Sequence, residues 1–408
     1  MRYGLRFAHV LMGTLGAMAC AFAAARGADD PPKYKTYEFE SADGVKLEGN
    51  LWSNAGAANK KDATVLLLHN FNDKTGGSSR DEGWDQLGDK LLDQGYSVFS
   101  FDFRGFGGST KVNPEKFWDL RRNPQNQYIQ GHNTLPLADT IDHAKFEHSY
   151  YPYLANDVEA AKAFLDRRND SGEVNTSSLF VIGAGEGATV GALWMASQWH
   201  LQKGDLDALG NVIFDLKTRK YSLQEPEGRD QGGAIWLSLS PTLAGNSVKT
   251  SVHNLVGEVG GADRVPMVFL YGGKDKEGKE FAGSCLQAII SGYHRGTGGS
   301  VPAVEVMEKM EEKEPTAAWK LPDTIKHAVG EDTTLVGSKL LADDNTAKTI
   351  VNVLNKIMKD RKNLESKKHD DENAAFFWTF GPALSEAKKA KDPTLPLIDK
   401  NIKARFMP

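Results

Sequence analysis

Residues 179–199 read LFVIGAGEGATVGALWMASQW, and this stretch decides the fold. Leu179–Ile182 is an unbroken apolar run of the kind that forms a buried strand. Glycine at 183, 185 and 187 then permits a tight turn, because glycine tolerates backbone conformations that other residues avoid. The following residues suit a helix as far as Trp199. We therefore predict a strand, a sharp turn and a helix.

The flanking segments repeat this alternation. Residues 41–44, Ser-Ala-Asp-Gly, are a hairpin signal between two strands. Strands alternating with helices form a parallel sheet covered on both faces, so we predict an α/β fold with a mostly parallel, doubly wound sheet. Further strands are expected within Tyr34–Trp52 and at Ala63–His69, Ser97–Phe103, Ala234–Leu239, Met267–Tyr271 and Ala303–Met307, and further helices at Trp84–Gln94, Tyr153–Arg168 and Thr333–Asp360.

The composition excludes several classes of protein. The 408 residues carry a net charge of −5, which gives no general attraction for nucleic acid. Two cysteines are too few for a disulfide framework or a cysteine-rich metal site. We expect a globular protein with no nucleic-acid partner, no cofactor and no metal.

The N-terminal residues have the features of a targeting segment. Arg2 and Arg6 precede an apolar run, and small residues close it before residue 28. This order predicts a secretory signal peptide at residues 1–28, with a run too short for a membrane span. Cys20 lacks the upstream Leu usual in lipoproteins, so a lipoprotein is not expected. The expected location is secreted or periplasmic, with no transmembrane helix after cleavage.

One main domain is expected at residues 29–360. Residues 111–152 are interpreted as a lid-like insertion over the upper edge of the sheet, and residues 204–230 as a second, polar insertion. Residues 361–408 begin with a charge run and then contain the aromatic cluster 376–378, Phe-Phe-Trp. This end is interpreted as a charged linker before a docked segment, or as a partner-binding tail.

Five short motifs follow one another in the order of a known family. They are LLLHNF (66–71), FDFRGFGGS (101–109), VIGAGEGA (181–188), LSLSP (237–241) and YGGKD (271–275). From Tyr34 to Asp360 the chain resembles the α/β-hydrolase superfamily, nearest to its dienelactone-hydrolase and esterase-like members. The resemblance implies an α/β-hydrolase fold.

The resemblance also implies roles for individual residues. The backbone N–H groups of Phe71 and Glu186 would form the oxyanion hole. Asp102 and Arg104 would tie a structural loop, and Asp275 would take the position of the acid in a catalytic triad.

Two positions depart from the family pattern. The elbow motif G-x-S-x-G places Gly185 at the nucleophile position, where it offers no hydroxyl to activate. A shift of one residue would instead make Glu186 the nucleophile, as an alternative. Val336 stands where the catalytic histidine would be, and the nearest imidazole is His327, which is expected in a loop.

Other kinds of chemistry find less support in the sequence. Residues 183–188 fit a loose dinucleotide fingerprint, but the acids that follow lie in a polar insertion rather than at the end of a strand. His143 and His148, with Asp139 and Asp142, are interpreted as solvated rather than as metal ligands.

Three hypotheses for function follow. The first is a catalytically impaired pseudo-hydrolase that binds a small-molecule ligand or a protein partner in the old active-site cleft. The second is a weak hydrolase of ester-type bonds that does not use serine. The third is a structural or scaffold protein of the cell envelope.

Overall fold

The structure is a computed structural model with two units, the second of which comprises residues 34–408. The predicted signal peptide and the predicted strand Ala303–Met307 lie outside the described residues. The described residues are 33–57, 61, 63–81, 83–209, 211–217, 220–261, 265–297, 325–330, 332–360, 369, 376–378 and 388–389.

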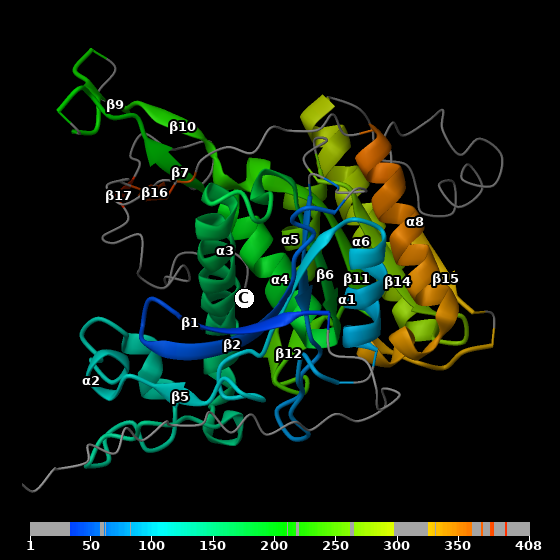
Figure 1. Ribbon diagram of the computed structural model, residues 1–408, viewed down its shortest axis with the longest axis horizontal. Helices are drawn as coiled ribbons and strands as arrows, with labels where there is room; N and C mark the ends of the chain where they lie inside the picture. The colour runs from blue at the N-terminus through cyan, green and yellow to red at the C-terminus, as the bar shows by residue number, and fades with distance from the viewer. Residues whose placement is uncertain are drawn as a thin grey trace, which may run out of the picture. The chain divides into compact units, whose positions relative to one another are not determined.

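A nine-stranded sheet forms the centre of the second unit (Figure 1). Its order is β1-β2-β4-β3-β6-β11-β14-β15, with β5 paired to β2. The strands from β4 to β15 run parallel, and β2 is antiparallel to its neighbours. The strands are β1 (Lys35–Glu40), β2 (Val45–Trp52), β3 (Thr64–Leu68), β4 (Ser97–Phe101), β5 (Lys111–Val112), β6 (Leu179–Ala184), β11 (Gln231–Leu237), β14 (Met267–Gly272) and β15 (Ile325–Val329).

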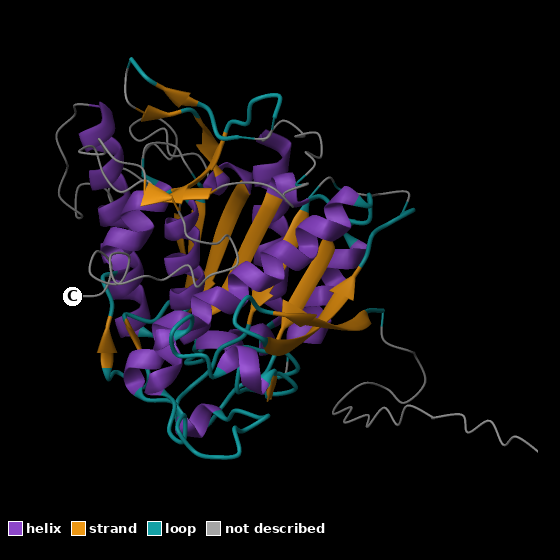
Figure 2. Ribbon diagram, turned by 90° about the vertical axis from the view of Figure 1, so that its left-hand side faces the viewer, coloured by secondary structure: helices purple, strands orange, loops and turns teal. Residues whose placement is uncertain are grey.

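Helices cover both faces of this sheet (Figure 2). Alternate side chains of a strand point to opposite faces, so Leu66 and Leu68 join one core cluster and Val65 and Leu67 the other. Helices α3–α6 pack on the first face, and α1 and α8 on the second. The α-helices are α1 (Trp84–Asp93), α2 (Pro114–Phe117), α3 (Ala155–Asp170), α4 (Gly185–Gln198), α5 (Val252–Gly260), α6 (Lys276–Thr297) and α8 (Asp344–Asp360).

Short elements complete the described part of the chain, and they include a second, four-stranded sheet in the order β10-β7-β16-β17. None of the described helices is both long enough and apolar enough to cross a bilayer. The remaining strands are β7 (Leu201–Gly204), β8 (Phe214–Asp215), β9 (Lys220–Tyr221), β10 (Leu223–Pro226), β12 (Thr242–Leu243), β13 (Val248–Lys249), β16 (Phe376–Trp378) and β17 (Lys388–Lys389). The 3₁₀ helices are η1 (Pro124–Tyr128), η2 (His143–Lys145), η3 (His148–Leu154), η4 (Thr176–Ser178), η5 (Glu227–Asp230) and η6 (Gly337–Ala342).

The fold class predicted from the sequence is confirmed. The chain has an α/β-hydrolase fold, with a mostly parallel sheet between two layers of helices. Two local predictions are wrong. His327 lies in strand β15 rather than in a loop, and the segment 333–360 is a loop, η6 and α8 rather than one helix.

Candidate functional site

The sharp turn between β6 and α4 is built from three glycines that cannot be replaced freely. Gly185 begins α4 with φ of +52°, in the left-handed region. A Cβ on Gly183 would lie 2.7 Å from the Cα of Ala188, and one on Gly187 would lie 2.1 Å from the carbonyl oxygen of His69. Gly185 therefore lies at the centre of a turn between two glycines that leave no room for a side chain.

The side chain of Asn70 fills the space beside Gly185. Its Oδ1 accepts a hydrogen bond of 3.3 Å from the backbone N–H of Glu186. A Cβ on Gly185 would lie only 2.0 Å from this oxygen. On its other side, the Asn70 Nδ2 would lie 3.3 Å from a Cβ on Gly337. The amide therefore stands between the β6–α4 turn and the start of η6.

Asn70 is the functional candidate that reasoning from the sequence missed. Its signal was the motif His69-Asn70-Phe71, which has Asn where the family usually has Gly. Phe71, one of the two expected oxyanion-hole residues, is buried among the rings of Phe103, Phe106 and Tyr151. The other expected donor, the N–H of Glu186, is the group that Asn70 engages.

The carboxylate of Glu186 is held by backbone donors from another loop. Its two oxygens accept hydrogen bonds of 2.7 Å from the N–H of Ala244 and 2.9 Å from that of Gly245. Three consecutive residues, 244–246, have positive φ, and successive N–H groups in such a turn can form a concave anion site. Burial raises the pKa of Glu186 to about 7, and the nearby charge of Asp73 acts in the same direction. Glu186 therefore binds a proton far more readily than an exposed glutamate.

Two buried polar atoms beside Glu186 have no hydrogen-bond partner among the described residues. They are Oδ1 of Asp73 and the hydroxyl of Tyr151. Burial raises the pKa of Tyr151, with further contributions from the charges of Asp73 and Glu186. A buried polar group without a partner is costly in a native structure, so these atoms are the natural contact points for a ligand or an ordered water.

The loop after β4 is tied by buried charges. Asp102 accepts hydrogen bonds from the N–H groups of Ser79, at 2.7 Å, and Gly108, at 2.8 Å. Arg104 is fully buried, and its guanidinium lies 2.6 Å from Asp43 and 2.7 Å from Asp157. Asp102 and Arg104 therefore stabilise the loop after β4 rather than the turn at Gly185.

Asp275 and His327 lie at different levels of the sheet. Asp275 follows β14 and caps α6, where its carboxylate accepts a hydrogen bond of 2.9 Å from the N–H of Gly278. The backbone of His327 pairs across the sheet with Leu270, Leu237 and Ala184 in one row. At about 4.8 Å per strand, three spacings separate the backbone of His327 from that of Ala184 by roughly 14 Å. Val336, the residue predicted to stand at the position of the family histidine, directly precedes η6 and is exposed.

The histidines of the 111–152 segment have local contacts. His143 stacks on Phe106 with ring centroids 4.4 Å apart, and its Nδ1 lies 3.2 Å from the carbonyl oxygen of Gly105. His148 lies 3.9 Å from Asp73. These contacts place the segment over the carboxyl edge of the sheet, close to the turn at Gly185.

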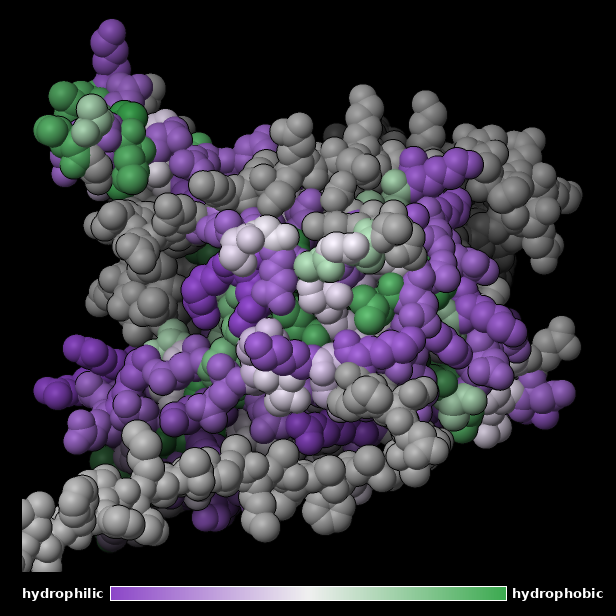
Figure 3. All heavy atoms as spheres, in the orientation of Figure 1, coloured by the Kyte–Doolittle hydropathy of each residue, from purple (hydrophilic) through white to green (hydrophobic). Residues whose placement is uncertain are grey.

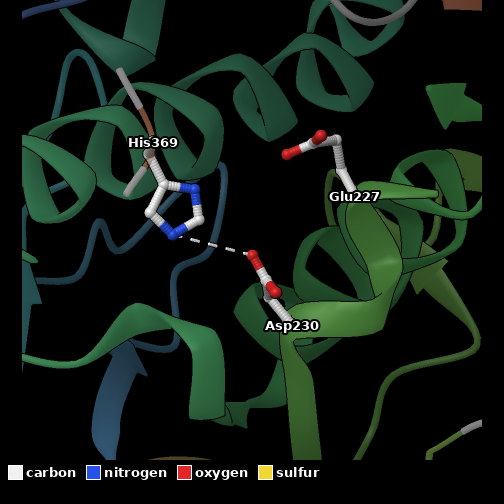
Figure 4. A group of neighbouring side chains, drawn as sticks. All are labelled: Glu227, Asp230 and His369. Atoms are coloured by element: carbon white, nitrogen blue, oxygen red, sulfur yellow. Dashed lines mark ion pairs between the residues drawn. The ribbon is translucent and has the colours of Figure 1, made fainter. Parts of the chain in front are cut away.

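A separate group has ligand atoms close enough to share a cation: the half-buried Glu227 with the buried Asp230 and His369 (Figure 4). Two lysines already supply positive charge there. The Lys162 ammonium lies 3.9 Å from Asp230, and that of Lys203 lies 3.6 Å from Glu227. This charge balance favours an ion-pair network over a metal site.

Known proteins resemble this chain in structure alone. No family model matches it, and no curated protein matches it. Similar solved structures include an α/β serine hydrolase without a lid from Xanthomonas campestris, at 12% identity, covering 81% of this chain and 96% of that chain with a TM-score of 0.39. Another is an esterase from Pyrococcus furiosus, at 14% identity, covering 82% and 96% with a TM-score of 0.41.

A third similar structure is a cold-adapted esterase from an Arctic intertidal metagenomic library. It is 13% identical and covers 81% of this chain and 99% of that chain, with a TM-score of 0.38. Similarity at this level assigns neither an activity nor a substrate to this protein.

Proposed function

We propose that this protein is an exported pseudo-hydrolase that binds a ligand in the cleft beneath residues 111–152. The observation that carries the proposal is the pairing of Gly185 with Asn70. An elbow without a hydroxyl has no nucleophile. The Asn70 amide, moreover, already occupies the N–H of Glu186 that would otherwise stabilise an oxyanion.

The polar groups around Glu186 limit what such a site would bind. Glu186 and Asp73 are carboxyl groups, and the Tyr151 hydroxyl lies close enough for their charges to affect its pKa. Like charges repel in a poorly solvated site, so an anionic ligand is disfavoured. A neutral or cationic ligand that donates hydrogen bonds fits these groups best.

The second hypothesis, a hydrolase with Glu186 as its nucleophile, has less support. Both carboxylate oxygens of Glu186 accept backbone hydrogen bonds from residues 244 and 245. A nucleophilic carboxylate needs a free oxygen directed at the reacting carbon. The export of the protein rests on the N-terminal sequence pattern alone.

The test is labelling of the native protein with a fluorophosphonate probe, together with a broad screen of ester substrates. We expect no labelled serine and no ester turnover. Ser238→Ala is the variant to test, because the Ser238 hydroxyl is buried, has no hydrogen-bond partner within the part of the chain that the structure describes, and belongs to a residue with φ of +48°. Labelling or turnover that Ser238→Ala abolishes and Ser240→Ala preserves would overturn the pseudo-hydrolase proposal.

A further inference from the structure

Residues 205–222 form a projection that we call the arm. It lies between β7 and β10, which pair with each other. Three backbone hydrogen bonds join residues 205, 213 and 222 at its base. Two hairpin loops extend from this crossing, one closed by the bridge between Leu206 and Val212 and the other by β8 and β9 (Figure 1).

The arm carries most of the exposed apolar side chains. Six of the nine exposed large hydrophobic residues in the described part of the chain belong to it. Leu209 and Leu216, one in each loop, are 85% and 83% exposed. Figure 3 shows hydrophobic residues gathered at the end of the arm. Contiguous apolar surface of this kind marks a site of contact with a protein or a membrane.

The apolar residues of the arm do not lie on one face. Ile213 lies at the crossing at the base of the arm, Phe214 begins strand β8, and Leu209 lies in the other loop. Ile213 and Phe214 are exposed, at 42% and 44%. A protein groove would cover one side of so thin a hairpin and leave the other in water. A fluid lipid interface would surround both sides and both loops.

The polar groups of the arm are also compatible with a lipid interface. The carboxylate of Asp207 accepts hydrogen bonds of 2.9 Å from the N–H groups of Leu209 and Asn211. That of Asp215 accepts one of 2.7 Å from the backbone N–H of Lys217. Lys217 is exposed and directly follows Leu216, so its ammonium can contact a lipid phosphate. The Phe214 and Tyr221 rings pack edge to face at 5.0 Å, and such rings favour the membrane–water interface.

We propose that the arm inserts into the surface of a lipid bilayer. Leu209, Phe214 and Leu216 enter the boundary between headgroups and acyl chains, and Lys217 contacts phosphates. The attachment is peripheral and reversible, because its strength depends on the apolar area of one small projection. This inference is independent of the function proposed for the cleft.

The experiment is flotation of the protein with phosphatidylcholine vesicles, with or without phosphatidylglycerol. The form used begins at residue 29, so that the apolar N-terminal segment does not contribute. We expect binding to both vesicles, and tighter binding to the anionic ones. Leu209→Ser with Leu216→Ser should weaken the partition coefficient about 100-fold, at roughly tenfold for each side chain no longer buried.

Two variants make the test specific. Leu135→Ser is the matched control, because Leu135 is 82% exposed but lies outside the arm, and it should bind as the unmodified protein does. Lys217→Gln should weaken binding to anionic vesicles only. Equal loss in the Leu135 control would overturn the proposal, as would no vesicle binding by the unmodified protein. Self-association that needs Leu209 and Leu216, without vesicle binding, would show instead that the arm is a protein interface.

Discussion

Replacing Gly185 with serine should destabilise the protein, although serine is the residue that an active elbow carries. The new Cβ would lie 2.0 Å from Oδ1 and 2.7 Å from Cγ of Asn70, so that side chain must move. The left-handed φ costs a non-glycine residue about 1–2 kcal/mol. Displacing the packed amide costs about 1–3 kcal/mol more, and losing its hydrogen bond to Glu186 costs about 1 kcal/mol. The expected loss is therefore about 3–6 kcal/mol.

The assay is urea unfolding of four proteins: the unmodified chain, Gly185→Ser, Asn70→Ala and the double variant. Removing the Asn70 amide also removes the collision, and the hydrogen bond to Glu186 is then lost only once. The double variant should therefore be more stable than the sum of the single effects predicts by about 2–4 kcal/mol. Gly172→Ser is the matched control, since Gly172 has φ of +79° but a Cβ there would have no atom within 4 Å. It should lose only the backbone contribution of about 1–2 kcal/mol.

Additive effects of the two substitutions, within about 0.5 kcal/mol, would refute this reasoning. So would a Gly185→Ser variant that is no less stable than the Gly172→Ser control. Either result would mean that Asn70 does not fill the space of the missing side chain.

Three further predictions concern charged groups. Because the pKa of Glu186 is raised, the folded state retains a proton that the unfolded state releases. The free energy of unfolding should therefore fall by up to about 3 kcal/mol between pH 4.5 and pH 7. In urea unfolding, Glu186→Gln should remove this component from the pH profile. Arg104→Lys should cost about 3–5 kcal/mol in the same assay, because one ammonium cannot bridge both Asp43 and Asp157. Zn²⁺ should not raise the melting temperature, and a rise that His369→Ala abolishes would show that Glu227, Asp230 and His369 bind metal.

The sequence predicted the sheet well because its strands are continuous apolar runs. Residues 64–68 and 179–184 are buried on both faces, and that burial leaves a direct mark on the amino-acid pattern. Residues 325–329, Ile-Lys-His-Ala-Val, include two polar side chains, so they do not form a continuous apolar run that would indicate a buried strand. The prediction of a loop at His327 failed for this reason.

The contacts of the candidate site could not be predicted in the same way. Asn70 follows strand β3, whereas Glu186 lies in the first turn of α4 after strand β6, and only the folded sheet brings them together. The groups that donate to Glu186 are the backbone N–H groups of residues 244 and 245, and the amino-acid types at those positions do not indicate this contact. The arm was interpreted as a polar insertion because acids and lysines separate its apolar residues along the chain.

The sheet at the base of the arm has a consequence for the order of events during synthesis. Strand β7 pairs on one edge with β10, which follows it closely, and on the other with β16, in which Phe377 lies opposite Gln202. While the chain leaves the ribosome, that second edge of β7 stays open until almost the whole protein has been made. An open strand edge is a template for pairing with other chains. Chains shortened before residue 376 would keep this edge permanently, and premature termination would therefore yield a product prone to aggregate.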